Sequence, residues 1–444
     1  MTGILRLGSI RVCPVKIAGE ANIHSLTITP STSVQNITPT GTIDGYNPIT
    51  VNAVTSSIDN NVVAGNIKEG VNILGVTGTY GGSSETPYYW LQRSLDANNK
   101  LERVSQTTIS LPNIEDVGDY CLYGAFEEDS AVQRVVLSDL EEVSGAYALG
   151  CVFHRCPNLT SINLSSLTTV SGSHALELAF GRSGISGTVS FPALTSVSGE
   201  RALSGLFTGC TSLTGISFPN LTIVSGNSVL SDLVSGCTSL TSIDLSSITS
   251  ASSGQNTFMY LCQNCTNLVT VSLPSIGELT RTSMFTKAFM GCTSLTTING
   301  LSSVTRLDLS SFEYTFAGCT SLTSVNFASL TNLSNGYALG HTFSGCTGLT
   351  SITFPSLNAV KSSRTMYYAF ENCTNLTSIS FPALKSDSFT SSYTNQFNNM
   401  LAGCTGVTVR FPSNLQSVIG SWTDVVNGFG GTNTTVLFNL PATS

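Results

Sequence analysis

The sequence contains little charge. Only 10% of its 444 residues are Asp, Glu, Lys or Arg, against roughly 25% in an ordinary soluble domain, so Ser, Thr and Asn must supply most of the polar surface. The net charge of −8 arises in residues 85–142, which hold twelve acids and four bases. Because no segment is strongly basic, the composition argues against a nucleic-acid partner.

Long apolar runs are also missing. No stretch reaches the roughly 18 apolar residues that a membrane-spanning helix needs, so we expect no membrane insertion. The first residues, Met1 to Gly8, lack the basic stretch and apolar run of a secretory signal. Most of the thirteen cysteines recur at one position of a repeat, where stacked buried thiols are expected in place of disulfides. These features favour assembly in a reducing cytoplasm.

Catalytic motifs are absent as well. The sequence has four histidines, and none lies in a nucleophile or metalloprotease motif. Cys151, His154 and Cys156 place three soft ligands within six residues, but a fourth is not evident, so no metal is expected. Cys262 and Cys265 form a CxxC only because both occupy repeat positions that predict burial. We therefore expect a protein that is not an enzyme, with no catalytic residues and no cofactor.

A repeat of 27 residues organises most of the chain. The phrase Gly-Cys-Thr-Ser-Leu begins at Gly209, Gly236, Gly291 and Gly318, with close variants between and after these copies. Its cysteines form a column, hereafter the cysteine column, whose members are 27 residues apart except for one step of 28: Cys210, Cys237, Cys265, Cys292, Cys319, Cys346 and Cys373. The column extends back to Ser183, Cys156 and Asp129, and forward to Cys404. A fixed period of this length is typical of a solenoid.

Each repeat divides into two patterns. Apolar residues recur seven, four and three positions before the column, and with the column itself they form one stripe of an α-helix. After the column, Ile243 and Leu245 alternate with Ser242, Asp244 and Ser246, which predicts a short strand with one buried face. The glycine before many column cysteines is typical of a helix C-terminus. We therefore predict an α/β solenoid of helix–strand repeats, with a parallel sheet on one wall and helices on the other.

The repeated Leu-Thr-Ser-Ile-x-Phe-Pro resembles the leucine-rich repeats of the BspA-like type over residues 125–415. Two features depart from that pattern: the asparagine ladder of standard leucine-rich repeats is missing, and residues 181–191 form a degenerate turn. Residues 83–128 are interpreted as a linker and an acidic N-terminal cap, residues 129–415 as the repeats, and residues 416–444 as a C-terminal cap.

Residues 1–82 have a different composition and predict a small β-rich domain. Short β-branched runs at 23–30, 46–54 and 71–79 suit strands, and residues 55–67 show near-helical spacing. Residues 29–78 resemble a segment of virion and tail-fibre proteins of tailed phages and prophages, where it precedes varied distal domains. The resemblance implies an attachment domain over residues 1–82 and brings no catalytic residues.

The exposed positions of the predicted strands are the candidate binding surface. They form a neutral, hydroxyl-rich face represented by Ser161, Asn163, Ser242, Asp244, Ser324, Asn326, Ser351 and Thr353. This face could meet a glycan or a protein through many hydrogen bonds, or could simply be solvated. Variable positions of the predicted helices offer aromatic and cationic side chains as an alternative, at Tyr337, Arg364, Tyr367, Tyr368 and Tyr393.

The function expected from these features is a phage tail or capsid fibre protein that acts as an adhesin. Residues 1–82 would bind other virion proteins, and the solenoid would bind a host-surface glycan or protein. The expected location is the virion, assembled in the host cytoplasm, and a homo-oligomer is compatible with the sequence. The alternatives are a bacterial cell-surface adhesin of the BspA-like kind and a virion decoration protein with no receptor.

Overall fold

The computed structural model describes residues 107–110, 114–120, 122–251, 254–274, 277–388, 395–419 and 428–442, together with short strands between residues 10 and 103. Those strands form antiparallel pairs: β1 (Ile10–Val12) with β3 (Leu26–Ile28), β4 (Gln35–Ile37) with β5 (Ile49–Val51), β6 (Asn72–Ile73) with β7 (Val76–Thr77), β8 (Arg93–Leu95) with β9 (Leu101–Arg103), and β2 (Val15–Ile17) with β11 (Ile114–Val117). The strands predicted at 23–30, 46–54 and 71–79 each overlap one or two of these. The helical spacing predicted at 55–67 lies outside the described residues.

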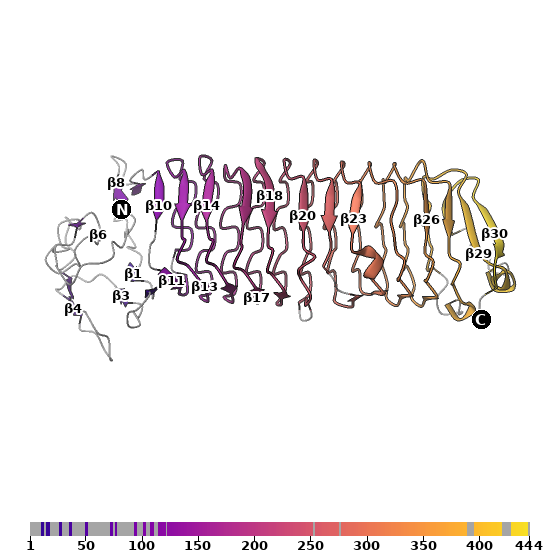
Figure 1. Ribbon diagram of the computed structural model, residues 1–444, viewed down its shortest axis with the longest axis horizontal. Coiled ribbons are helices and arrows are strands. Elements are labelled where there is room, and N and C mark those ends of the chain that lie inside the picture. The colour runs from indigo at the N-terminus through magenta and orange to yellow at the C-terminus, as the bar shows by residue number, and fades with distance from the viewer. Residues whose placement is uncertain are drawn as a thin grey trace, which may run out of the picture.

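From residue 107 onward the chain winds as a solenoid whose main strands stack in parallel (Figure 1). Three runs of paired strands follow one another along this strand wall. They are β10 (Thr108–Ser110), β12 (Arg134–Val136) and β14 (Ser161–Asn163); then β16 (Gly187–Ser190), β18 (Leu213–Ser217), β20 (Ser242–Asp244), β21 (Thr270–Ser272) and β23 (Thr297–Asn299); then β26 (Ser351–Thr353), β28 (Ser378–Ser380), β29 (Thr408–Pro412) and β30 (Thr435–Leu440). The parallel sheet predicted from the repeat is confirmed.

A second parallel ladder, which the sequence did not predict, runs along the opposite edge of the ribbon in Figure 1. Its strands have two residues each: β13 (Glu142–Val143), β15 (Thr169–Val170), β17 (Ser196–Val197), β19 (Ile223–Val224), β22 (Glu278–Leu279), β24 (Arg306–Leu307), β25 (Asn332–Leu333) and β27 (Ala359–Val360). These strands contain the return segment after Pro-x-Leu-Thr. The second residue of each strand is buried, and in β27 both residues are buried, so the return path is hydrogen-bonded and contributes to the core.

The predicted helix in each repeat is wrong. Residues 146–155 and their equivalents form consecutive turns, and this stack of turns, hereafter the turn wall, takes the place of the helical layer. Every fourth residue has a left-handed backbone: in one repeat these are Tyr147, Cys151 and Arg155, with φ between 53° and 57°. A right-handed α-helix excludes such angles.

The hydrogen bonds of the turn wall alternate between two kinds of acceptor. Leu149 and Cys151 donate their backbone N–H to carbonyls of the next repeat, at 2.7 and 2.8 Å, whereas Gly150 and Val152 donate to carbonyls three residues back, both at 3.2 Å. Half of the N–H groups therefore join repeat to repeat, as in a parallel sheet. The backbone N–H groups of the turn wall are therefore hydrogen-bonded without the i to i−4 bonds of a helix.

The burial predicted for three positions of each repeat is confirmed. The residues seven, four and three positions before the cysteine column are buried in every repeat from residue 149 to residue 401. Phenylalanines stack along the solenoid in ladders with ring centroids 5.1–5.9 Å apart; the three longest are Phe126–Phe153–Phe180–Phe207, Phe289–Phe316–Phe343–Phe370 and Phe327–Phe354–Phe381–Phe411–Phe438. One continuous core results.

Helical structure within the described residues is short. It comprises η3 (Leu301–Ser303), η4 (Ser386–Ser388), η5 (Ser413–Leu415) and α1 (Gln416–Ile419). Beyond α1, β30 pairs in parallel with β29, so this part of the predicted C-terminal cap continues the strand wall. Among the described residues, no helical segment has the length and apolar composition needed to traverse a lipid bilayer.

Candidate binding surfaces

Seven of the eight side chains predicted as a binding surface on the strand wall are exposed. Ser161, Ser242, Asp244, Ser351 and Thr353 are exposed on β14, β20 and β26, and Asn163 is half-buried at the end of β14. Ser324 and Asn326 are also exposed, in a segment between β24 and β25 that forms no strand. The structure therefore aligns these side chains along one wall.

Part of the hydrogen-bonding capacity of that wall is used by the fold. The Asn163 side-chain oxygen accepts the backbone N–H of Ser165 at 3.0 Å, and Asp244 accepts that of Ser246 at 2.9 Å. These contacts close local turns. The Thr353 hydroxyl pairs with the Ser380 hydroxyl of the next strand at 2.9 Å. The wall presents fewer open polar groups than its composition indicates.

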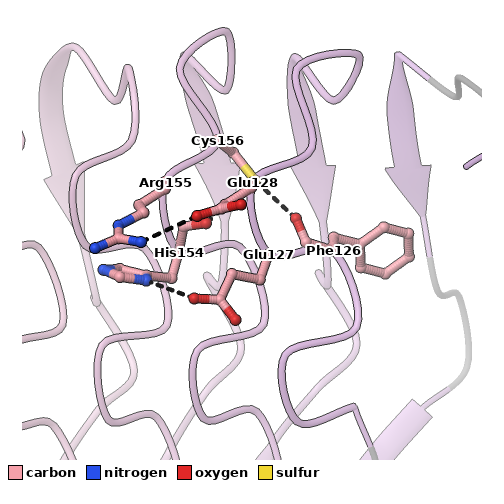
Figure 2. A network of polar contacts seen from close by, with 6 residues as sticks. All are labelled: Phe126, Glu127, Glu128, His154, Arg155 and Cys156. Atoms are coloured by element: carbon pink, nitrogen blue, oxygen red, sulfur yellow. Dashed lines mark hydrogen bonds and ion pairs between the residues drawn. The ribbon is translucent and has the colours of Figure 1, made fainter. Parts of the chain in front are cut away.

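The Cys–His segment does not form a ligand cluster. Figure 2 shows the His154 ring directed at Glu127, with Nδ1 3.0 Å from the carboxylate, while the Cys156 thiol donates to the Phe126 carbonyl at 3.0 Å. The Cys151 thiol contacts the phenol of Tyr123. Three candidate ligands thus have three different partners. Among the described residues, no group of three or more His, Cys, Asp or Glu side chains is placed to hold a metal ion.

The cysteine column has a polar role as well as a packing role. Each thiol donates a hydrogen bond to a backbone carbonyl of the previous repeat. The acceptor is the residue three positions before the column residue of that repeat. Cys319 donates to Phe289 at 3.3 Å and Cys346 donates to Phe316 at 3.1 Å. In the degenerate turn, Ser183 occupies the column, is buried, and lies 3.5 Å from the Cys210 sulfur. The thiols therefore give these carbonyls a second donor while filling the corner.

Burial makes the column thiols poor nucleophiles. It raises the pKa of Cys319 well above its ordinary value, and the neighbouring thiols Cys292 and Cys346 raise it further. Burial likewise raises the pKa of Cys346 to about 12. Since the thiolate is the reactive form, these groups stay protonated and unreactive at neutral pH.

We expect alkylation of the native protein to discriminate sharply between the described cysteines. Cys151 is the one among them that is not buried, whereas Cys319 and the other nine need unfolding before iodoacetamide reaches them. Burial and the charge of Glu127 also raise the pKa of Cys151, so its labelling rate should still be rising at about pH 9. Peptide mass spectrometry would read each site; native labelling of Cys319 below that pH would contradict the prediction.

A row of stacked side chains crosses the turn wall five positions before the cysteine column. Its members, hereafter the tyrosine row, lie 27 residues apart and are all half-buried: Tyr260, Lys287, Tyr314, His341 and Tyr368. The His341 ring lies between Tyr314 and Tyr368, with centroids 4.3 and 5.0 Å apart and planes within 5° of parallel. The Lys287 amine lies 5.5 and 5.6 Å from the ring centroids of Tyr260 and Tyr314, a cation–π arrangement.

Three further side chains flank the row. Arg364 donates to the Tyr337 hydroxyl at 2.8 Å and its guanidinium lies 5.8 Å from the Tyr367 ring. Tyr367 stands at 78° to Tyr368, with centroids 4.5 Å apart. The aromatic and cationic residues predicted on the helices thus gather on the turn wall, apart from Tyr393, which lies outside the described residues.

Two carboxylates lie close to the row. Glu371 lies 3.4 Å from His341 Nδ1 and accepts the Ser344 hydroxyl at 3.0 Å. Burial raises the pKa of Tyr314, and the charges of Glu313 and Glu371 raise it further. The Tyr314 phenol is therefore a hydrogen-bond donor at neutral pH.

Most of the row was missed by reasoning from the sequence. Tyr260, Lys287 and Tyr314 were not singled out, and His341 was considered only as one of four histidines that lie in no catalytic motif. The 27-residue spacing of these positions was available as a signal. It carries structural meaning only once the turn wall, which places equal positions directly over one another, is known.

A similar but shorter group, hereafter the N-terminal stack, lies at the start of the turn wall. Tyr147 lies between Tyr120 and His174, with centroids 4.8 and 4.4 Å apart. His174 and Arg201 both contact Glu177. The charged side chains here are already paired with one another.

The parallel solenoid with short repeats and a leucine-rich core defines the class of protein. The family model described as the BspA type leucine rich repeat region matches six copies, in residues 194–315 and 313–422, which together make up just over half of the chain. The chain therefore belongs to the BspA-type leucine-rich repeat family.

The chain is also similar to several solved structures of leucine-rich repeat proteins. A leucine-rich repeat protein from Bacteroides ovatus is 20% identical, with 77% of this chain and 96% of that chain covered and a TM-score of 0.33. A T. pallidum leucine-rich repeat protein is 22% identical over 54% and 91%, with a TM-score of 0.29. A leucine rich cell surface protein from Faecalibacterium prausnitzii is 20% identical over 67% and 95%, with a TM-score of 0.25.

At these identities and TM-scores the structures add no argument to the family assignment. No curated protein is significantly similar to the chain in sequence. Neither the family match nor these structures indicate a phage or virion origin, so the resemblance of residues 29–78 to virion proteins stays a prediction.

Proposed function

We propose that the chain is a non-enzymatic recognition module that is displayed on a surface and binds a partner on a host. The observation that carries this proposal is the tyrosine row. Tyrosine and arginine are enriched among the residues that dominate binding energy at interfaces, and here both lie in or beside one row across five repeats. A rigid continuous core holds them in place.

Two settings for display fit this function. In the first, the chain is a phage virion fibre that residues 1–82 attach to other virion proteins, as the resemblance of residues 29–78 implies. In the second, it is a bacterial cell-surface adhesin. Membership of the BspA-type family favours the second setting, and the F. prausnitzii neighbour is described as a cell surface protein.

The two settings predict different locations for the protein. Quantitative mass spectrometry of purified phage particles and of cell-envelope fractions from the same culture would locate it. Enrichment with the particles supports the virion setting, and enrichment in the envelope supports the adhesin setting. Recovery from the cytosol alone would contradict display in either setting.

The recognition function itself is tested by binding. Fluorescently labelled full-length protein should bind intact host cells saturably, and excess unlabelled protein should compete. Absence of saturable binding to cells, proteins and glycans alike would reject the recognition function.

A further inference from the structure

We propose that two copies of this chain associate through the outer edge of β30, in an antiparallel pairing that joins the strand walls of the two solenoids into one sheet. The partner is a second copy, and the pairing does not depend on what the solenoid recognises. Three features of β30 lead to this inference: an open edge, the lack of residues that usually protect an edge, and a sequence that is complementary to itself.

β30 is the last strand of the strand wall and lies at the C-terminal end of the solenoid in Figure 1. Its inner edge pairs with β29, where Thr435 donates its N–H to the Val407 carbonyl at 2.9 Å. Because the backbone groups of successive residues in a strand point to opposite sides, those of Val436 and Phe438 face outward. No strand in the described part of the chain pairs with this outer edge. Such a row of N–H and C=O groups is a template for another extended chain.

The outer edge of β30 also lacks the features that keep edge strands apart. The strand has six residues, more than any other strand that the structure describes, and it contains neither a charge nor a proline. The neighbouring strand β29 has both, in Arg410 and Pro412. Uncharged six-residue segments of high β-propensity associate readily when their edge is open. We therefore expect this edge to be covered in solution.

The core is incomplete at the same place. Phe411 is fully buried and its ring stacks between Phe381 and Phe438, with centroids 5.4 and 5.9 Å away. Phe438 is the last ring of this ladder among the described residues, and it and Val436 pack against the core while remaining half-exposed. A second copy placed edge to edge would cover this apolar face, as a further repeat of the solenoid would.

A second copy of β30 is complementary to the first. In an antiparallel pair, directly opposed side chains share a face of the sheet, so the two-fold axis must pass beside a residue. With the axis at Leu437, Val436 of each copy lies opposite Phe438 of the other, on the core side of both. Since β30 is uncharged, this arrangement brings no like charges together. A two-fold contact of this kind closes at two copies and leaves no further edge.

The N-terminal end of the solenoid offers no equivalent edge. There β10 has only three residues, and β11 is already paired with β2. Asp116, Asp119, Glu127 and Glu128 also lie at that end, so two N-terminal ends repel each other. A head-to-tail contact would have to match a strand of six residues to one of three. The structure therefore favours pairing between two C-terminal ends.

Sedimentation velocity of the full-length protein over a dilution series tests the pairing. One strand-to-strand contact is smaller than a standard interface, so we expect a monomer of 46.6 kDa at about 1 µM and a dimer by about 200 µM. Hydrogen exchange measured at both ends of the series needs no variant. The amides of Val436 and Phe438 should exchange more slowly at the higher concentration, because only the dimer gives them a hydrogen-bond acceptor.

Leu437→Lys and Leu437→Glu are the test variants. Leu437 lies beside Arg410 in the register of β29 and β30, so this face of the sheet already carries a charge and both variants should fold. In the dimer the two Leu437 side chains lie opposite or diagonal to each other, within about 8 Å. Each variant alone should therefore raise the dissociation constant at least about tenfold. An equimolar mixture of the two should restore the dimer, because opposite charges then meet.

Val136→Lys is the matched control. Val136 is half-buried on β12, a strand of the same wall whose two edges are both paired, with β10 and β14. The substitution places the same charge on the same wall away from the proposed contact, so the dissociation constant should not change.

The outcomes separate the pairing from other arrangements. A protein that stays monomeric throughout the series, with unchanged exchange at Val436 and Phe438, would overturn the inference. Dimers that tolerate both Leu437 substitutions would overturn the choice of surface. A mixture no more dimeric than the single variants would overturn the two-fold pairing, as would species that keep growing with concentration. Recognition of a host partner is tested separately by the cell-binding experiment.

Discussion

Replacing Phe316 with alanine should lower the free energy of unfolding by about 3–5 kcal/mol. Phe316 is fully buried, and its ring stacks between Phe289 and Phe343 with centroids 5.6 and 5.8 Å away. Removing the ring deletes both stacks and leaves a cavity in a core that continues on either side. Neighbouring repeats cannot close the gap, because their backbones are fixed by hydrogen bonds between repeats.

The effect should be local as well as large, because each repeat of a solenoid contacts only its neighbours. Hydrogen exchange of the amides between residues 289 and 346 should accelerate more than exchange near residue 150. Phe126→Ala is the matched control: Phe126 is half-buried at the end of its ladder and, among the described residues, its ring stacks only on Phe153, at 5.1 Å. Its substitution should cost no more than about half as much. Equal losses for the two variants would contradict a core whose strength comes from continuous stacking.

The period and the core could be predicted from the sequence because both depend on side-chain character alone. Counting from the cysteine column gave the buried positions, and the alternation of Ile243 with Ser242 and Asp244 gave the strand that became β20. Parallel stacking follows from identical repeats, since equal residues then lie one above another. Even Ser183 in the degenerate turn retains the buried position of its column.

The turn wall could not be predicted from the same pattern. Buried residues at seven, four and three positions before the column are compatible with a helix of 3.6 residues per turn and also with turns of four residues. The two differ in the left-handed residues that recur every fourth position. Glycine marks only the last of these in several repeats, as at Gly318, whereas Tyr314 and Ser310 occupy the other two in the same repeat. Tyrosine and serine give no signal for a positive φ.

The candidate binding surfaces could be predicted from the sequence only in part. Most of the predicted strand-wall positions are exposed, but the sequence could not show that Asn163 is half-buried or that Asn163 and Asp244 accept hydrogen bonds from the nearby backbone. The tyrosine row was present as a 27-residue spacing. Its meaning depended on the turn wall, because in a helical layer the same residues would lie on separate helices and would not stack at 4.3 Å.

Replacing Gly199 with alanine should destabilise the solenoid by at least about 3 kcal/mol. Gly199 belongs to a column with Gly145, Gly172, Gly226 and Gly254, in which each glycine lies against the backbone of the previous repeat. A Cβ on Gly199 would overlap the backbone carbonyl of Gly172. A backbone atom cannot rotate away as a side chain can, so two repeats must separate for the methyl group to fit.

Separation would weaken the hydrogen bonds that join these repeats, such as the one from Ser198 N–H to the Val170 carbonyl at 2.9 Å. Gly277→Ala is the control, because a Cβ there would lie 3.6 Å from its nearest neighbours, an ordinary contact. We expect Gly277→Ala to change the free energy of unfolding by less than about 1 kcal/mol. Guanidinium denaturation of both variants would measure the difference. A Gly199→Ala protein as stable as Gly277→Ala would show that the spacing between repeats is set by the side chains of the core, and that close backbone contact at this column is incidental.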